Sequence, residues 1–323
     1  MKKLIFEKTG LPKDVLQLQE LPIPTPKANE VLVKVKAAPI NPSDTMFVQG
    51  LYGLRPELPS GAGFEGAGTV EAVGEGVELP LGTTVSFAGV GAWAEYIIVP
   101  ANSVIPLPPN IPFEVAAQVF VNPFTAWAML HESKLQAGDW LLLTAGGSSF
   151  AQLVIQMATR KGIKTICTVR RDDQIEQLKQ LGATEVVNTA KDFLPKKVKI
   201  ITDGKFANVC FDATGGELGG LALQSLAIGG TMWVYGMMSQ QETPLHNGIV
   251  LFKNLTVKGF WLSTWLPNAP KEVRKEAAQT VIGMLARKEL QTSIEATYPL
   301  ANFQEALQHN DKEGRKGKVL LTM

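Results

Sequence analysis

A glycine-rich segment near the start of the chain contains the first residues that could do chemistry. Residues 60–70 read SGAGFEGAGTV, which places four glycines around one carboxylate, Glu65, and one aromatic ring, Phe64. Glycines let the backbone approach a phosphate group, a carboxylate can bind a metal ion, and glycines also permit the tight turns of a small β-barrel. The segment is therefore a candidate phosphate site, a candidate metal site or a turn of the scaffold.

The cysteines and histidines do not favour a metal site. Cys167 and Cys210 each lie in an apolar run, and His131, His246 and His309 are far apart, with no H-x-x-x-H spacing. Structural zinc sites and disulfide frameworks both need clustered or paired cysteines. We expect two buried, reduced thiols and no metal.

A second glycine-rich segment lies where a dinucleotide loop would be expected. The apolar run at 139–145, DWLLLTA, predicts a buried strand, and residues 149–162, SFAQLVIQMATRKG, have apolar positions at helical spacing. Between them, GGSSFA at 146–151 supplies small residues that let the backbone approach a pyrophosphate at the start of a helix. A strict G-x-G-x-x-G is absent, and an ordinary strand-to-helix turn would look similar, but the strand–loop–helix context favours nucleotide binding.

Two arginines follow the next predicted strand, KTICTV at 164–169. A site for NAD would place an acid near this point to bind the ribose 2′-hydroxyl. Arg170 and Arg171 stand there instead, and paired guanidinium groups suit a 2′-phosphate. The alternative is a solvated start of a helix, where the helix dipole disfavours arginine. The pair therefore favours NADPH over NADH.

Composition and charge restrict the class of protein that holds these residues. The chain has 323 residues, 45% hydrophobic and 19% charged, which suits a two-domain globular protein. A net charge of +1 gives no electrostatic case for a nucleic-acid or membrane partner. No apolar run is long enough to span a membrane, and the start, MKKLIFEKTG, lacks the features of a signal or transit peptide. We expect a cytoplasmic protein.

The pattern of predicted elements changes near residue 120. Short strands separated by turn residues, at 31–40, 66–74, 83–89 and 94–100, predict a small β-barrel or sandwich. After residue 138, strands alternate with helices, which predicts a doubly wound parallel sheet. The further strands are expected at 184–188, 208–215 and 230–236, with helices at 172–182 and 219–227.

The C-terminal part of the chain is expected to return to the first domain. A helix is predicted within 273–290 and a final strand within 314–323. The predicted domains are therefore 1–121 with 263–323, and an inserted nucleotide domain at 122–262. The apolar segment GTMWVYGMM at 230–238 is predicted to be the exposed late strand of the sheet, which favours a homodimer because an unpaired apolar edge is a liability.

The segment GFEGAGTVEAVG at 63–74, together with the domain arrangement, resembles the medium-chain dehydrogenase/reductase superfamily over nearly the whole chain. The zinc-containing alcohol dehydrogenases of that superfamily carry a histidine where Phe64 stands and a cysteine near the position of Pro42. Their structural-zinc lobe needs four cysteines, and this chain has two. The resemblance therefore implies a scaffold turn without metal, in which Glu65 is structural.

Three further segments resemble the zinc-free, mitochondrial-type 2-enoyl thioester reductases. They are NPSDTMFVQGLYGLRPELPSG at 41–61, VNPFTAWAML at 121–130 and KGFWLSTW at 258–265. Quinone oxidoreductases share the scaffold and the Asn-Pro pair at Asn41, but they do not usually share the Q-G-x-Y-G pattern or the G-F-W-L-S-x-W pattern. The combination in this order is specific.

Carried over position by position, this resemblance implies a set of site residues. Tyr52 would be catalytic, and an NADPH site would be formed by Asn122, Gly147, Ser148, Ser149, Phe150, Arg170, Arg171, Asp172, Tyr235, Gly236, Met237, Met238, Phe260, Trp261, Leu262 and Lys318. The family loop often reads N-S-x-V-G, so the bulky Phe150 is a departure. Its ring would either crowd the pyrophosphate edge or pack inward.

The implied reaction is the reduction of the C=C bond of a 2-enoyl thioester. Hydride is added at the β-carbon, charge develops on the thioester oxygen, and a proton is added at the α-carbon. Without a metal, a neutral phenol such as Tyr52 could donate the hydrogen bond and the proton. An NADPH:quinone oxidoreductase and a non-catalytic NADPH-binding protein are the alternatives. Trp261 and Trp265 would form walls of the substrate pocket or pack in the core.

Overall fold

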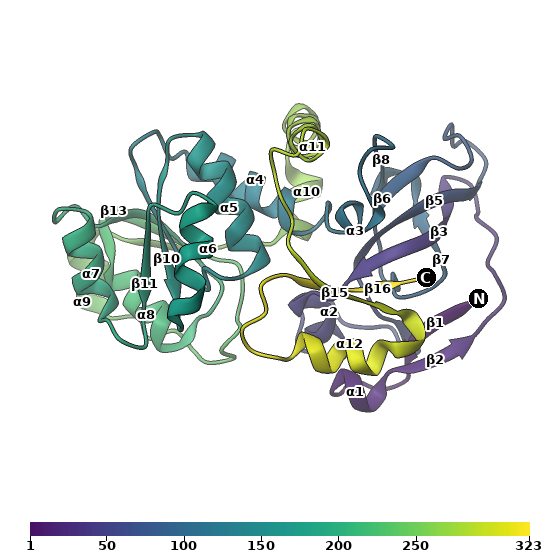
Figure 1. The fold of residues 1–323 in the computed structure, drawn as a ribbon, viewed down its shortest axis with the longest axis horizontal. Helices are drawn as coiled ribbons and strands as arrows, with labels where there is room; N and C mark the ends of the chain where they lie inside the picture. The colour runs from purple at the N-terminus through teal and green to yellow at the C-terminus, as the bar shows by residue number, and fades with distance from the viewer. The chain divides into compact units, whose positions relative to one another are not determined.

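The computed structural model describes residues 1–323, and the chain divides into two compact units. Unit 1 contains residues 1–122 and 282–323, and unit 2 contains residues 123–281. The nucleotide unit is thus inserted into the first unit, and both chain ends belong to unit 1 (Figure 1). The first boundary lies next to the expected one. The second boundary lies inside helix α11 (Lys271–Ala286) and not at 262/263, because α10 (Leu262–Asn268) and most of α11 cluster with unit 2.

Unit 1 is built around a seven-stranded sheet. Its final strand lies in the interior of that sheet, parallel to one neighbour and antiparallel to the other. The order is β15 (Ile294–Pro299), β16 (Lys318–Thr322), β3 (Glu30–Pro39), β5 (Glu65–Val73), β6 (Thr84–Ala88) and β8 (Val104–Pro106), with β7 (Tyr96–Pro100) also pairing with β3. A second sheet has the order β2 (Gln17–Glu20), β1 (Lys2–Phe6) and β4 (Ser60–Gly61). The four strands expected before residue 100 and the final strand are confirmed.

Short helices complete unit 1 and cover its apolar core. They are α1 (Pro12–Val15), α2 (Pro42–Val48), α3 (Phe113–Ala116) and α12 (Phe303–Asn310). Helix α2 begins with a capping box, in which the backbone N–H of Asn41 donates to Oδ2 of Asp44 at 2.7 Å. Proline at the first helical position has its φ already set for a helix, so Pro42 also favours this start. The chain that leaves α2 leads to Tyr52.

Unit 2 is a parallel sheet with helices on both faces, as the sequence predicts. The order is β11 (Glu185–Asn188), β10 (Lys164–Val169), β9 (Trp140–Leu143), β12 (Ala207–Asp212), β13 (Leu226–Val234) and β14 (Thr256–Gly259). Helices α5 (Ser149–Arg160) and α6 (Ile175–Gln180) lie on one side (Figure 1). Helices α7 (Leu194–Ile201), α8 (Gly216–Gln224) and α9 (Asn247–Lys253) lie on the other. The strand order reverses between β9 and β12.

Helix α5 forms where the sequence predicts it. Phe150, Val154 and Met157 are buried on its inner face, and the Ser148 hydroxyl caps its start by accepting the Ala151 N–H at 3.2 Å. Gly162, with φ of 69°, allows the chain to turn after the helix. The preceding helix, α4 (Asn122–Ser133), leads the chain into this unit.

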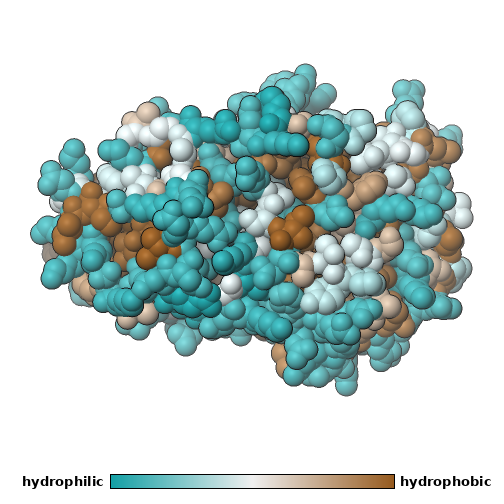
Figure 2. All heavy atoms as spheres, viewed as in Figure 1, coloured by the Kyte–Doolittle hydropathy of each residue, from teal (hydrophilic) through white to brown (hydrophobic).

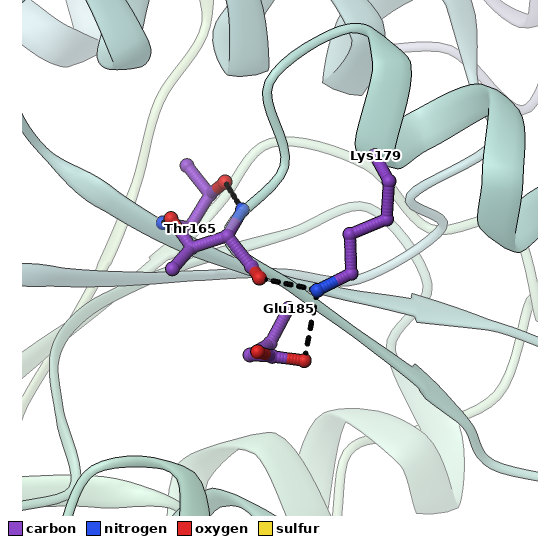
Figure 3. Close-up of polar contacts among 4 residues, drawn as sticks. Thr165, Lys179 and Glu185 are labelled. Carbon is purple, nitrogen blue, oxygen red and sulfur yellow. Dashed lines mark hydrogen bonds and ion pairs between the residues drawn. The ribbon is translucent and has the colours of Figure 1, made fainter.

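Polar contacts fix the return from α6 to the sheet. The Lys179 ammonium donates to the Thr184 carbonyl oxygen and to Glu185 Oε2, the latter at 3.0 Å. The Thr184 N–H donates in turn to the Thr165 hydroxyl at 3.3 Å, so α6, β10 and β11 are joined at one point (Figure 3). These contacts are largely exposed, so they orient the three elements but add little to the free energy of unfolding.

The expected edge strand is wrong. Strand β13, which contains most of the segment GTMWVYGMM, is paired along both of its edges, with β12 and with β14. The true edge is β14, whose four residues are all exposed. Sequence patterns missed β14 because a strand exposed on both faces lacks the apolar alternation by which strands are predicted. None of the helices has the length and apolar composition needed to cross a membrane.

Candidate active site

The glycine-rich loop of unit 2 packs tightly against the neighbouring strand. The Gly146 N–H donates to the Thr168 carbonyl oxygen at 2.8 Å, and a Cβ at Gly146 would lie 2.7 Å from the Cβ of Cys167. At the start of α5, the N–H groups of Ser149 and Phe150 donate to no protein acceptor, as is usual for the first turn of a helix. The loop and these free N–H groups fit a pyrophosphate.

Phe150 packs inward and does not crowd the loop. Its side chain is 5% exposed, and its ring centroid lies 4.2 Å from that of Tyr235. Burial raises the pKa of Tyr235 well above its usual value, and the nearby carboxylate of Asp212 adds to this effect. The phenol therefore stays neutral. Phe150, the residue that departs from the family pattern, therefore affects the packing on the inner side of the loop. The residues on the outer side of the loop are small.

The arginines after β10 lie in a group of alternating charges. Arg171 forms a two-pronged ion pair with Asp173, at 3.0 and 2.6 Å. Asp172 contacts the Lys191 ammonium and accepts the Asn188 amide at 2.6 Å, and these hydrogen bonds lower the pKa of Asp172. Arg170 directly precedes this group in the chain, and guanidinium groups at this point suit a phosphate. Lys191 is a cation that the sequence analysis did not single out.

The remaining predicted residues of unit 2 follow β13 and β14. Met237 and Met238 are exposed beyond the end of β13. Beyond β14, Phe260 is buried and its ring centroid lies 6.3 Å from that of Trp265, whereas Trp261 is exposed. The Trp265 indole N–H donates to Glu132 at 3.1 Å. The structure thus places Trp265 in the packing of unit 2 and Trp261 at its surface. Tyr235, Gly236 and Leu262 complete these two segments.

A buried carboxylate that the sequence analysis missed lies at the ends of the two central strands. Asp212 is fully buried, and its Oδ1 accepts the Thr144 hydroxyl at 2.6 Å. The Thr214 N–H and hydroxyl donate to the same oxygen at 3.1 and 2.9 Å, and the Gly215 N–H donates to Oδ2 at 3.0 Å. The signal in the sequence is an acid directly after the buried run NVCF and before a glycine pair.

In unit 1, Glu65 is the centre of a buried polar cluster. Its side chain is 1% exposed, and it accepts the Asn41 amide at 2.8 Å. Its second oxygen accepts the backbone N–H groups of Phe120 and Val121, at 3.1 and 2.8 Å. Glu65 therefore holds the backbone directly before Asn122, the first residue of α4 and a predicted cofactor contact. This supports a structural role for the carboxylate.

Lys318 belongs to the same cluster. Its ammonium donates to the Asn41 amide oxygen, and burial lowers its pKa to about 8 against the opposing effect of Glu65 and Asp44. Burial raises the pKa of Asp44 to about 7, and Oδ1 of this carboxyl group has no hydrogen-bond partner. The predicted contact of Lys318 with the cofactor stays a prediction, because the structure accounts for its ammonium within unit 1.

Tyr52 lies beyond α2 and is held by aromatic packing. Its ring centroid is 5.3 Å from that of Phe64, which lies 5.0 Å from the ring of Phe47 on α2. Gly50, with φ of 73°, lets the chain turn between the helix and Tyr52. Phe64 therefore supports the candidate catalytic residue. No group of three or more histidine, cysteine, aspartate or glutamate side chains in the structure could hold a metal ion.

Comparison with known proteins identifies the family. The family described as "Alcohol dehydrogenase GroES-like domain" matches residues 27–109, and the one described as "Zinc-binding dehydrogenase" matches residues 151–281. The mitochondrial enoyl-[acyl-carrier-protein] reductase of Rattus norvegicus is 35% identical over 331 residues, covering 100% of this chain and 89% of that protein. The chain belongs to the zinc-free medium-chain dehydrogenases/reductases. The human enzyme of the same name gives the same identity and coverage.

Solved structures of this family have the same fold. The quinone oxidoreductase of Escherichia coli, solved as a complex with NADPH, matches with a TM-score of 0.93 and 29% identity over 100% of both chains. A quinone oxidoreductase of Pseudomonas syringae matches with a TM-score of 0.91 and 28% identity, over 100% of this chain and 99% of that chain. The small β-barrel unit and the inserted doubly wound parallel-sheet unit predicted from the sequence are confirmed as the GroES-like unit and the Rossmann unit of this family.

Proposed function

We propose that this medium-chain reductase uses NADPH to reduce the C=C bond of 2-enoyl thioesters, with Tyr52 as the proton and hydrogen-bond donor. The observation that carries the proposal is the full-length similarity to enoyl-[acyl-carrier-protein] reductases, at 35% identity. It includes the segment that carries Tyr52. Such an enzyme would serve fatty acid metabolism, and the expected cytoplasmic location is part of the proposal.

The residues of unit 2 fit the cofactor. The loop at 146–149 and the free N–H groups of α5 would hold the pyrophosphate, and Arg170 and Arg171 would bind the 2′-phosphate. When bound, NADPH supplies the hydride that is added to the β-carbon of the enoyl group. The NADPH complex of a structural relative supports this assignment.

The residues of unit 1 would complete the reduction. Charge develops on the thioester oxygen after hydride addition, and a positioned phenol can stabilise it by a hydrogen bond without carrying charge itself. The proton at the α-carbon then comes from Tyr52 or through it from solvent. Packing against Phe64 restricts the ring, which reduces the entropy lost when the substrate is positioned.

A direct assay tests the proposal against its main alternative. NADPH oxidation is followed with crotonyl-CoA and, in parallel, with a simple quinone. We expect rapid oxidation with crotonyl-CoA. Activity with the quinone alone would replace the proposal by the second candidate, an NADPH:quinone oxidoreductase, which the similarity to solved quinone oxidoreductases favours. NADPH binding without turnover of either substrate would favour a non-catalytic role.

The proposal includes a homodimer formed through the β14 edge of unit 2. Beside this exposed strand lie Leu251 and Phe252 on α9, which are 71% and 82% exposed, and Ile228 on β13. Hydrophobic residues gather on the surface over the end of unit 2 that carries α7 and α9 (Figure 2). A second copy would cover such a surface and pair its edge strand across a two-fold axis.

Light scattering tests this assembly. We expect a dimer at micromolar concentration and a monomer for Phe252→Asp, because a buried unpaired charge opposes association. The matched control is Leu81→Asp, which places the same charge at an exposed apolar residue of unit 1. A monomeric wild type, or a dimer that Phe252→Asp leaves intact, would contradict this interface.

A further inference from the structure

The carboxylate of Asp212 connects three segments of the candidate cofactor site. Through Oδ1 it binds Thr144, which directly precedes the loop at 145–148. Through Oδ1 and Oδ2 it binds the backbone N–H groups of Thr214 and Gly215, which lead into α8. Since β9 and β12 are the adjacent strands at which the strand order reverses, this contact spans the place where open α/β sheets bind ligands.

The loop held by Asp212 in turn holds the segment after β13. The Tyr235 N–H donates to the Asp212 carbonyl oxygen at 3.0 Å, and the Met238 N–H donates to the Ala213 carbonyl oxygen at 3.0 Å. Gly236 packs so closely that a Cβ there would lie 2.7 Å from the Ala213 carbonyl oxygen. Tyr235, Gly236 and Met238 belong to the predicted cofactor contacts, so this part of the site depends on the turn that Asp212 fixes.

The backbone before the glycine-rich loop is strained at this point. Ala145 follows Thr144 and has φ of 49°, in the left-handed region that favours glycine. Such a conformation persists only where surrounding bonds impose it. The Thr144 hydroxyl supplies two of these bonds, because it donates to Asp212 and accepts the Ala213 N–H at 2.8 Å.

The charge of Asp212 is not neutralised by a cation. All its hydrogen bonds come from hydroxyl and backbone N–H groups, and no lysine or arginine pairs with it. Backbone N–H groups donate to both oxygens of Asp212. This pattern fits an ionised carboxylate, in which both oxygens are hydrogen-bond acceptors. A fully buried carboxylate with neutral partners creates a negative potential around the ends of β9 and β12.

We propose that Asp212 is a positioning residue of the dinucleotide site whose buried negative charge favours the oxidised cofactor over the reduced one. When NADPH gives up hydride, both electrons of the C–H bond leave with the hydrogen and the nicotinamide ring becomes positively charged. A fixed negative charge nearby stabilises the ring after transfer and makes the bound reduced cofactor a stronger hydride donor. This rests on the NADPH site of the proposed function and on no assumption about the acceptor substrate.

The ratio of two dissociation constants tests the proposal. Kd for NADP⁺ and for NADPH is measured by calorimetric titration of the wild type and of Asp212→Asn, which removes the charge at nearly constant shape. An interaction of about 1.4 kcal/mol between the carboxylate and the charged ring corresponds to a tenfold difference between the two dissociation constants. We expect the ratio Kd(NADP⁺)/Kd(NADPH) to rise about five- to tenfold in the variant. An unchanged ratio would overturn the proposal.

Two sets of control variants separate charge from positioning. Thr144→Val removes the hydroxyl but keeps the charge, so we expect both dissociation constants to rise together and the ratio to stay constant, whereas Thr144→Ser should restore wild-type binding. Asp203→Asn makes the same chemical change at an exposed turn and should change neither constant. If Thr144→Val binds both cofactors as tightly as the wild type, the positioning role of Asp212 through Thr144 is contradicted.

The two dissociation constants of the wild type give a second test, which holds even if Asp212→Asn does not fold. We expect it to bind NADP⁺ no more weakly than NADPH, and NADP⁺ binding more than about tenfold weaker would overturn the charge effect. These titrations need no enoyl thioester or quinone. A wild type that binds neither cofactor would contradict the proposed function itself. Tight binding by the wild type, together with an unchanged Kd ratio in Asp212→Asn, would contradict only the charge effect of Asp212.

Discussion

The ring of Tyr52 lies against the ring of Phe64, with centroids 5.3 Å apart and planes inclined by 37°. In zinc-containing members of the superfamily, the position of Phe64 carries a metal ligand, according to the sequence resemblance. In this chain the same position carries the apolar ring of Phe64, on which the Tyr52 phenol packs. In the proposed mechanism, the Tyr52 hydroxyl would act on the substrate oxygen that a metal ion could otherwise polarise.

Tyr52→Phe should abolish most enoyl thioester reduction and leave the fold unchanged. The ring and its packing on Phe64 remain, but the hydroxyl that donates to the developing charge is gone. We expect kcat with crotonyl-CoA to fall about 10²–10⁴-fold with little change in the NADPH Kd. Tyr96→Phe, on strand β7, is the matched control. Full activity of Tyr52→Phe would contradict the assigned role.

Phe64→Leu should weaken catalysis through the position of Tyr52. Leucine keeps the site apolar but removes the flat face on which the phenol rests, so the phenol samples more orientations. We expect kcat to fall about tenfold, while the NADPH Kd stays constant because the cofactor loop is in unit 2. Phe193→Leu serves as control. If kcat for Phe64→Leu equals that of the wild type, the aromatic packing has no functional role.

Arg170→Ala combined with Arg171→Ala should remove the preference for NADPH over NADH. Each charge-assisted bond to the 2′-phosphate contributes about 1.5–3 kcal/mol, or roughly tenfold or more in affinity. NADH binding should change little, because NADH has no 2′-phosphate. Fluorescence titration with both cofactors measures the effect, with Lys161→Ala as an exposed control. Equal affinity of the wild type for NADPH and NADH would remove the argument.

The purified protein should work without zinc. Phe64 cannot bind a metal, and the carboxylate of Glu65 is already occupied by hydrogen bonds from Asn41, Phe120 and Val121. We therefore expect elemental analysis to find no stoichiometric zinc and a chelator to leave activity unchanged. One zinc ion per chain, together with inactivation by the chelator, would show that the site has been misinterpreted.

The buried carboxyl group of Asp44 should make stability depend on pH. Burial raises its pKa to about 7 in the folded chain, well above its value in the unfolded chain. Between about pH 5 and pH 7 the unfolded chain has released this proton while the folded chain still holds it. Rising pH therefore favours unfolding, by up to about 1.4 kcal/mol per pH unit from this group.

Melting temperatures measured from pH 5 to pH 8 test this expectation. Asp44→Asn removes the titrating group, so the melting temperature of the variant minus that of the wild type should increase from pH 5 to about 7 and then level off. Asp14→Asn, at an exposed position of α1, should give a difference that does not change with pH. A constant difference for Asp44→Asn would show that the carboxyl group titrates normally.

The parts of the fold that the sequence predicted are those with a local signal. The run DWLLLTA, the small residues after it and the helical spacing from Phe150 to Met157 are all contiguous, so β9, the loop and α5 were predicted close to their observed bounds. Strand β14 was missed because its four residues are exposed and carry no periodic apolar pattern. The mistaken edge strand followed from that omission.

The polar clusters could not be predicted because their partners are distant in sequence. Glu65 meets Asn41 across 24 positions, and Asn41 meets Lys318 across 277. Asp212 meets Thr144 across 68 positions. Spacing rules describe one helix or one strand, whereas these contacts arise when separate strands become neighbours. The direction in which Phe150 packs was left open for the same reason, because Tyr235 supplies its contact.

The position of β16 affects the order in which a newly made chain can fold. Strand β16 is synthesised after the other strands and helices of the two units, yet it lies between β3 and β15 and carries the Lys318 ammonium, which interacts with Asp44 and Glu65. Unit 2 is synthesised in full well before that strand, so it can become native first, although unit 1 contains the N-terminus. A chain that terminates just before Lys318 should therefore contain a folded nucleotide unit joined to an aggregation-prone, incomplete barrel.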